Sequence, residues 1–191
     1  MIYLWIIPLV LIVWFIAAYN SFVHLRNRTD EAWADIEVQL KRRFDLIPNL
    51  VNTIKGSTAF EQGTLTAVVE ARAKATSIQI DPTKVDADTM SKISASQGEL
   101  SSALGRLMVV SEQYPDLKSN QNFLSLQREL GDTEDKIQAA RRFYNGNVRD
   151  LNIKTESFPS NIIANIFKFT KRVFFDIPDD GPESKPVEVK F

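Results

Sequence analysis

Residues 119–156, SNQNFLSLQRELGDTEDKIQAARRFYNGNVRDLNIKTE, decide the fold of this chain of 191 residues. Their apolar and small positions recur at intervals of three and four, which places them on one face of an α-helix. This face consists of Phe123, Leu126, Leu130, Thr133, Ile137, Ala140, Tyr144, Asn147 and Leu151. No proline interrupts the pattern. We therefore expect one long helix whose heptad seam is covered by partner helices.

Three earlier segments, 29–56, 61–78 and 85–113, have the same spacing and predict those partners. Their inward positions are expected to be Trp33, Ile36, Leu40, Phe44, Ile47, Val51 and Ile54, then Leu65, Val68, Val69 and Ala75, then Met90, Ile93, Gln97, Leu100, Leu104 and Leu107. No useful run alternates with the period of two that marks a β-strand. The sequence predicts an all-α protein, most simply an elongated antiparallel four-helix bundle over residues 24–157.

Residues 1–23 predict a transmembrane anchor. Residues 2–18 are an unbroken apolar run that extends about 26 Å as a helix, and about 34 Å when residues 19–23 are added. A cleaved signal peptide is the alternative, but it would normally have a basic residue before the apolar core, and residues 1–7 have none. Basic residues follow the run, with Arg26 and Arg28 nearest and Lys41-Arg42-Arg43 beyond. This asymmetry predicts a short outer N-terminus and a cytoplasmic body.

Residues 158–175 are rich in isoleucine, phenylalanine and basic side chains, and predict a short C-terminal amphipathic helix. Packing on protein is favoured because Ile162, Ile163 and Ile166 are expected on one face, and bilayer contact is the alternative. The candidate lipid- or surface-contact residues are Arg26, Arg28, Lys168, Lys171 and Arg172. A solvated helix face is the simpler interpretation of Lys41-Arg42-Arg43. Residues 176–191 are acidic and proline-rich, and we expect disorder there.

The composition excludes most catalytic chemistry. The chain has no cysteine and one histidine, His24, beside the predicted anchor, so neither a Cys/His zinc site nor a Ser-His-Asp triad can be built. A metal held by carboxylates alone is not favoured by any spacing. Glu61, Glu70, Glu112 and Glu134 are instead expected to pair with Arg72, Arg128 and Arg141 between helices. The net charge of -1 offers no basic excess for nucleic acid. We predict no catalytic residue, metal or cofactor.

Two features are candidates for binding. The first lies around Pro48, which cannot donate a hydrogen bond to the Phe44 carbonyl. An asparagine could satisfy that carbonyl, and a helix kink is a simpler interpretation than a peptide-docking notch. The notch residues are Asp45, Pro48, Asn49 and Asn52.

The second feature is a line of small residues on the third predicted helix: Ser94, Gly98, Ser101 and Gly105. Each glycine costs about 0.8–1 kcal/mol in a helix relative to alanine, so the close approach of another helix would explain both. A tolerated, solvated face is the alternative. We expect self-association through this face into a homo-oligomer larger than a dimer.

Several strings carry a family resemblance: EAW at 31–33, QLKRR at 39–43, DLIPNLV at 45–51, EQYPDLK at 112–118, ARRFYN at 140–145 and FPSNIIA at 158–164. Together they resemble the LemA family of bacterial membrane proteins, from the membrane segment to about residue 175. The resemblance implies a single N-terminal anchor in the bacterial inner membrane, a cytoplasmic four-helix body and no established catalytic activity. It supplies no catalytic residues. It also implies a context, because relatives occur beside membrane metalloproteases of the HtpX type.

We therefore predict a non-catalytic scaffold or interaction protein of the inner membrane, linked to envelope maintenance or membrane organisation. Its predicted partners are further copies of itself and membrane lipids, and no nucleic acid. The alternative is an adaptor or regulator of a membrane metalloprotease.

Overall fold

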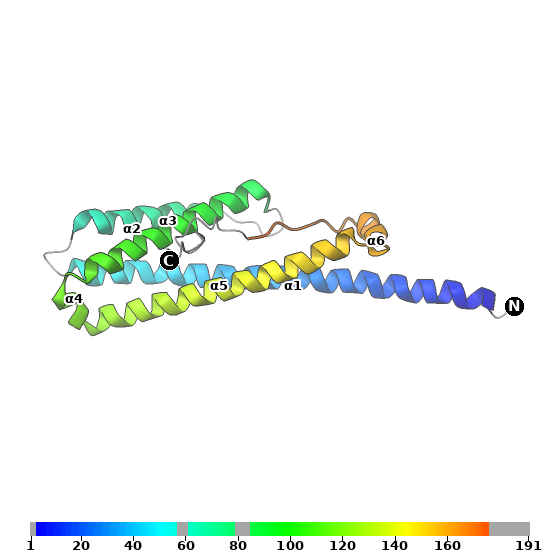
Figure 1. The fold of residues 1–191 in the computed structure, drawn as a ribbon, viewed down its shortest axis with the longest axis horizontal. Coiled ribbons are helices and arrows are strands. Elements are labelled where there is room, and N and C mark those ends of the chain that lie inside the picture. The colour runs from blue at the N-terminus through cyan, green and yellow to red at the C-terminus, as the bar shows by residue number, and fades with distance from the viewer. Residues whose placement is uncertain (1–2, 57–60, 79–84, 176–191) are drawn as a thin grey trace, which may run out of the picture.

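The computed structural model describes residues 3–56, 61–78 and 85–175 (Figure 1). Its helices are α1 (Tyr3–Lys55), α2 (Gln62–Thr76), α3 (Ala87–Ser111), α4 (Pro115–Ser119), α5 (Gln121–Glu156) and α6 (Ser160–Phe167). No strand occurs within these described ranges, so the all-α prediction is confirmed. The predicted disordered tail, residues 176–191, lies outside the described residues.

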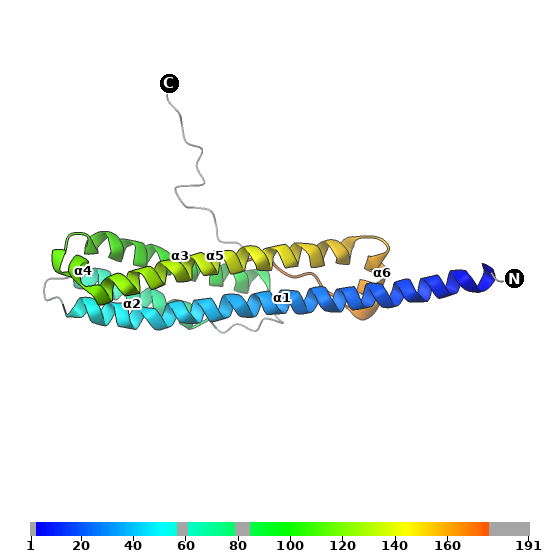
Figure 2. The ribbon, with the colours of Figure 1, turned by 90° about the horizontal axis from the view of Figure 1, so that it is seen from below.

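The long helices form two antiparallel pairs. Helices α1 and α5 run side by side in opposite directions, and the shorter α2 and α3 form a second pair along the C-terminal half of α1 (Figures 1 and 2). A shared core contains buried residues from all four helices, including Leu50, Val68, Leu100 and Phe123. A second core surrounds Trp33, and a third lies nearer the N-terminus around Phe22. The α2–α3 pair therefore covers only part of the length of α1 and α5.

Helix α1 is one continuous helix of 53 residues that joins the predicted anchor to the body without a linker. Along residues 6–16 its large apolar side chains point outward, whereas Phe22 and Trp33 are buried. Among the described helices, α1 is the one that is long and apolar enough to cross a membrane. The change from exposed to buried apolar residues marks the boundary between a candidate membrane span and the body.

Two details of the predicted helices were wrong. Val69 is exposed although Leu65, Val68 and Ala75 are buried, because only one narrow row of α2 side chains faces the core. The fourth predicted helix begins later, since a separate α4 precedes it. The Asn120 side chain caps α5 by accepting hydrogen bonds from the backbone N–H groups of Asn122 and Phe123.

The C-terminal segment is only partly helical. Helix α6 ends at Phe167. The next residue, Lys168, has a φ of 56° in the left-handed region, and residues 168–175 form an extended strap. The strap turns back over α5 and α1 (Figure 2). The three isoleucines lie within about 100° of the helix circumference, but Ile163 is buried whereas Ile162 and Ile166 are exposed, so only one of them packs on the body. On a helix, residue 163 lies about 100° from residue 162, which is enough to separate the two environments.

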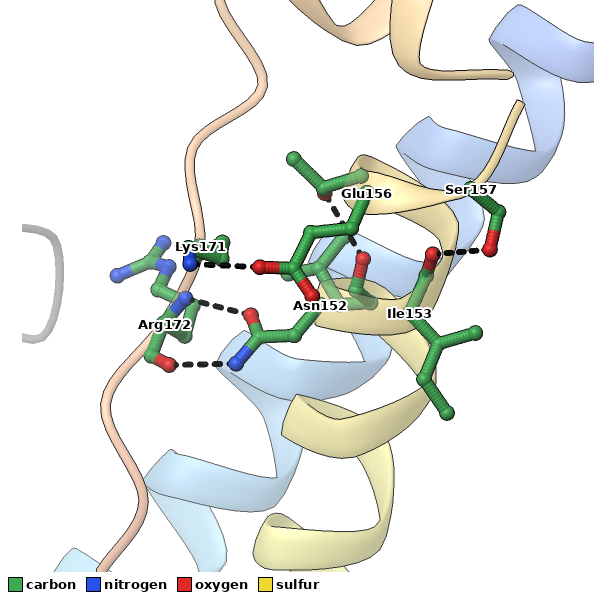
Figure 3. A network of polar contacts seen from close by, with 8 residues as sticks. Asn152, Ile153, Glu156, Ser157, Lys171 and Arg172 are labelled. Atoms are coloured by element: carbon green, nitrogen blue, oxygen red, sulfur yellow. Dashed lines mark hydrogen bonds and ion pairs between the residues drawn. The ribbon is translucent and has the colours of Figure 1, made fainter. Parts of the chain in front are cut away.

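Two asparagines of α5 hold the strap by pairing with its backbone. Asn152 accepts from the Arg172 N–H at 2.9 Å and donates to the Arg172 carbonyl at 2.9 Å (Figure 3). Asn145 makes the same two contacts with Phe175, at 2.8 and 3.0 Å. Seven residues of helix rise about 10.5 Å, and three extended residues span about 10 Å. The spacing of the asparagines therefore matches that of the strap residues.

Side chains reinforce this attachment. Phe175 is buried in the second core, where it meets Trp33 with ring centroids 5.9 Å apart. The Tyr144 hydroxyl donates to the Val173 carbonyl at 2.9 Å, and burial raises the pKa of Tyr144 to about 12. Arg172 forms an ion pair with Asp30 of α1 at 2.9 Å. The strap thus connects α5 to α1 beside the second core.

Candidate interaction sites

A buried arginine lies between three helices. Arg43 of α1 is 4% exposed, and its guanidinium contacts Glu134 of α5 at 2.9 Å and donates to the Ser101 hydroxyl of α3 at 2.8 Å. Burial lowers the pKa of Arg43, and the Glu134 carboxylate opposes that effect. The prediction of a solvated Lys41-Arg42-Arg43 face was therefore wrong for Arg43. Its position three residues after Leu40 and four before Ile47 was the signal for burial.

An open cavity of about 420 Å³ extends from this arginine between α3 and α5. Its polar lining consists of Arg43, Ser101, Gln127 and Glu134, with Gly105 and Gly131 among its other residues. A Cβ atom added at either glycine would meet nothing within 4 Å, so neither position requires glycine for packing within the chain. A polar ligand in this cavity could contact a guanidinium, a carboxylate and an amide, from Arg43, Glu134 and Gln127. It contains no histidine, the usual general base for a serine nucleophile.

The line of small residues on α3 is divided between different surroundings. Ser94 is buried, and Ser101 is half-buried through its contact with Arg43. Gly98 lines a cavity between α2 and α3, whereas Gly105 lines the cavity beside Arg43. As at Gly105, a Cβ atom at Gly98 would meet nothing within 4 Å. Packing inside the chain therefore does not explain the two glycines of α3.

The four predicted notch residues, Asp45, Pro48, Asn49 and Asn52, are all exposed on one side of α1. The Phe44 carbonyl accepts a hydrogen bond from Arg72 Nε of α2 at 2.8 Å. The expectation that an asparagine would satisfy this carbonyl was wrong, because α2 passes close enough to provide a donor. Arg72, which was predicted to pair with a glutamate, therefore binds a backbone carbonyl near Pro48. Glu134, which was predicted to pair with another arginine, pairs with Arg43.

The predicted lipid-contact residues lie near the junction of span and body. The Arg26 guanidinium lies over the Phe169 ring at 5.7 Å, and that of Arg28 lies over Phe143 at 5.6 Å. Lys171 pairs with Glu156 at 2.7 Å (Figure 3). Since Arg172 also forms an ion pair, these two strap residues attach the strap to the body. Lys168 is exposed at the end of α6.

Within residues 3–56, 61–78 and 85–175, no cluster of three or more acidic or histidine side chains could hold a metal ion. Sequence reasoning missed Asn145 and Asn152 as the residues that hold the strap. Their separation of seven, each one position after a residue of the predicted α5 face (Tyr144 and Leu151), was the available signal.

A helical body that continues directly from an outward-facing apolar helix defines a class, the membrane-associated helical proteins. The family model of the LemA family matches residues 32–191, and the chain belongs to this family. It is similar to protein LemA of Metamycoplasma hominis, with 28% identity over 78% of this chain and 65% of that protein. It is also similar to magnetosome protein MamQ 2 of Paramagnetospirillum magneticum, with 27% identity over 90% of this chain and 71% of that protein.

A third relative, magnetosome protein MamQ of Magnetospirillum gryphiswaldense, is 25% identical over 82% of this chain and 64% of its own length. The chain therefore spans about two thirds of the length of these relatives. None of the three names denotes an enzyme.

Proposed function

We propose that this protein is a non-catalytic scaffold of the bacterial inner membrane, anchored by residues 1–23, with a cytoplasmic body that assembles into homo-oligomers. The continuity of α1 carries the proposal. One helix presents apolar side chains outward along residues 6–16 and buries Trp33, Ile36 and Ile47 in the body. Because no linker separates the two parts, the membrane fixes the body close to its surface, where partners would be met.

The proposed role is to organise the membrane or maintain the envelope. Similarity to protein LemA and to magnetosome proteins, together with the apolar N-terminal part of α1, supports a role at membranes. The four helices of the body would act as one bundle, because buried residues from all four meet in one core. Its exposed helix faces would then provide the surfaces for assembly.

Topology is the first test of this proposal. A fluorescent reporter that matures only in the cytoplasm, fused after Phe191, is expected to give fluorescent membranes, because Arg26 and Arg28 follow the span. A periplasmic phosphatase fused at the same point is the matched control and should be inactive. Active phosphatase, or a mature protein that begins at Tyr19, would contradict the cytoplasmic, uncleaved arrangement.

Self-association is the second test. Gly98→Leu combined with Gly105→Leu is expected to disrupt the oligomer and preserve helical content, since leucine favours helix and a Cβ atom at either position meets nothing within 4 Å inside the chain. Mass photometry of nanodiscs would measure the copy number, and circular dichroism the helical content. Gly146→Leu on α5 is the matched control, because its Cβ also meets nothing within 4 Å.

Each result has a defined consequence. A monomeric wild-type protein in both mild detergent and nanodiscs would rule out the scaffold. An unchanged oligomer in the double variant would move the interface away from α3. A small assembly that holds a different protein at a fixed ratio would favour the role of protease adaptor.

A further inference from the structure

Helix α6 packs against the part of α1 that forms the last turns of the predicted anchor, residues 1–23. The Phe167 ring lies 4.7 Å from that of Tyr19 and 5.8 Å from that of Phe15, measured between centroids. Next to these contacts, Phe169 of the strap stacks on Phe22 at 4.8 Å. The small third core joins α6 to both α1 and α5 through Ala18, Leu151 and Ile163. The position of α6 along α1 is therefore set by several buried contacts.

This position determines the depth of α6 relative to a bilayer. A hydrocarbon core of about 30 Å takes about 20 residues of helix. The first arginine or lysine after the apolar run is Arg26, so such a core is expected to end a few residues before it, near residue 21. Phe15 and Tyr19 then lie in the last two turns within the membrane, where aromatic rings are favoured. A helix in contact with both rings must lie at the membrane interface.

The composition of α6 fits this environment. Asn161 and Asn165 occupy one side, and the apolar residues cover the remaining arc of about 200°, which also contains Ser160 at the first position of the helix. Packing against a protein core needs only about 100° of a helix. Ile163 and Ala164 supply the buried part of the arc, whereas Ile166 is 59% exposed beside an exposed Ile162. Phe158, just before the helix, is also exposed.

Cationic side chains lie at the same level. The Lys154 ammonium donates to the Ser21 hydroxyl and lies over the Phe22 ring at 5.3 Å. In the described part of the chain no carboxylate forms an ion pair with Lys154. Lys168 is exposed where α6 ends. Ammonium groups next to an interfacial apolar helix would lie beside lipid phosphates.

We propose that α6 is an interfacial membrane helix that inserts Phe158, Ile162 and Ile166 among the lipids around α1. The inference rests on the proposed anchoring of α1 and adds a second membrane contact, made by a segment about 140 residues further along the chain. Through its buried contacts with α1 and α5, α6 would fix how the body is rotated and tilted about its anchor. The occupant of the exposed apolar face is the lipid bilayer.

Single-cysteine variants of the full chain can test this, because the natural sequence has no cysteine. Ile166→Cys would be labelled with a polarity-sensitive fluorophore and reconstituted into vesicles of phosphatidylcholine and phosphatidylglycerol. Quenching by doxyl-labelled lipids and by aqueous iodide would then be compared. Val109→Cys on α3, at a residue 68% exposed, is the water-facing control, and Leu11→Cys reports the span.

The expected result is that the label at residue 166 is quenched by doxyl lipids and is several-fold less quenched by iodide than the label at residue 109. If the Leu11 label is lipid-accessible but the Ile166 label is quenched by iodide as strongly as the Val109 label, α6 is not interfacial and the anchor stands. A Leu11 label that is accessible to iodide would overturn the anchor itself. A label at residue 166 shielded from both quenchers would show a protein cover and also overturn the proposal.

Discussion

Phe175→Ala is expected to lower the free energy of unfolding by about 3 kcal/mol, within the range for truncating a buried phenylalanine. The Phe175 ring is 1% exposed, meets Trp33, and lies under the Arg141 guanidinium at 4.8 Å. Its removal leaves a cavity in the second core and weakens the end of the strap. Urea denaturation of the full chain in mild detergent, followed by circular dichroism, would measure the change.

The neighbouring residue provides a matched control. Phe174 is 43% exposed, so Phe174→Ala removes the same kind of side chain from a much more solvent-exposed position. We expect a loss below about 1 kcal/mol, as for ordinary surface substitutions. Equal losses for the two variants would show that burial at residue 175 does not hold the strap. Amide hydrogen exchange of the Phe175 N–H, which donates to Asn145, would report strap release directly.

Glu134→Gln is expected to destabilise the body by about 2 kcal/mol, and Arg43→Met by less than about 1 kcal/mol. The asymmetry follows from burial. Loss of the Glu134 charge leaves a guanidinium that is 4% exposed without its anion, whereas loss of Arg43 leaves a carboxylate that is 35% exposed and can be hydrated. Breaking a fully buried pair costs about 3–5 kcal/mol, and the partial exposure of Glu134 reduces that value.

A double-mutant cycle separates the two effects. The double variant is expected to be more stable than Glu134→Gln alone, because it no longer contains an uncompensated buried charge. Both variants keep side chains of similar length, so packing changes little. If the arginine variant were the less stable of the two single variants, the guanidinium would be contributing through packing, and the charge argument would fail.

The helices could be predicted because the information for them is local. The three-four spacing along residues 119–156 is enough to define α5 and its buried face, from Phe123 to Leu151. The same spacing includes position 43, but the sequence predicts a solvated arginine there because isolated buried charges are costly. Its burial depends on Glu134, 91 positions away, and only the folded arrangement of helices brings the two together.

The strap was beyond prediction for a related reason. Residues 168–175 have no internal hydrogen-bond pattern, and their conformation depends on the side chains of Asn145 and Asn152. Aromatic content predicted that this segment would bury surface, and Phe175 does so. Sequence alone predicted helix for all of it, since the apolar spacing of α6 carries no signal that the helix stops at Phe167.

The continuity of α1 also has a mechanical consequence. The part of α1 beyond residue 23 extends about 48 Å, and in the proposed anchoring a stiff rod of that length would act as a lever that pivots at the membrane surface. A transmembrane helix whose apolar length exceeds the bilayer thickness can adapt by tilting, and the average tilt of transmembrane helices is about 20°. At that angle the far end of the lever moves sideways by about 16 Å. A change in bilayer thickness would thereby become a displacement of the whole body, large enough to alter which neighbouring proteins it touches.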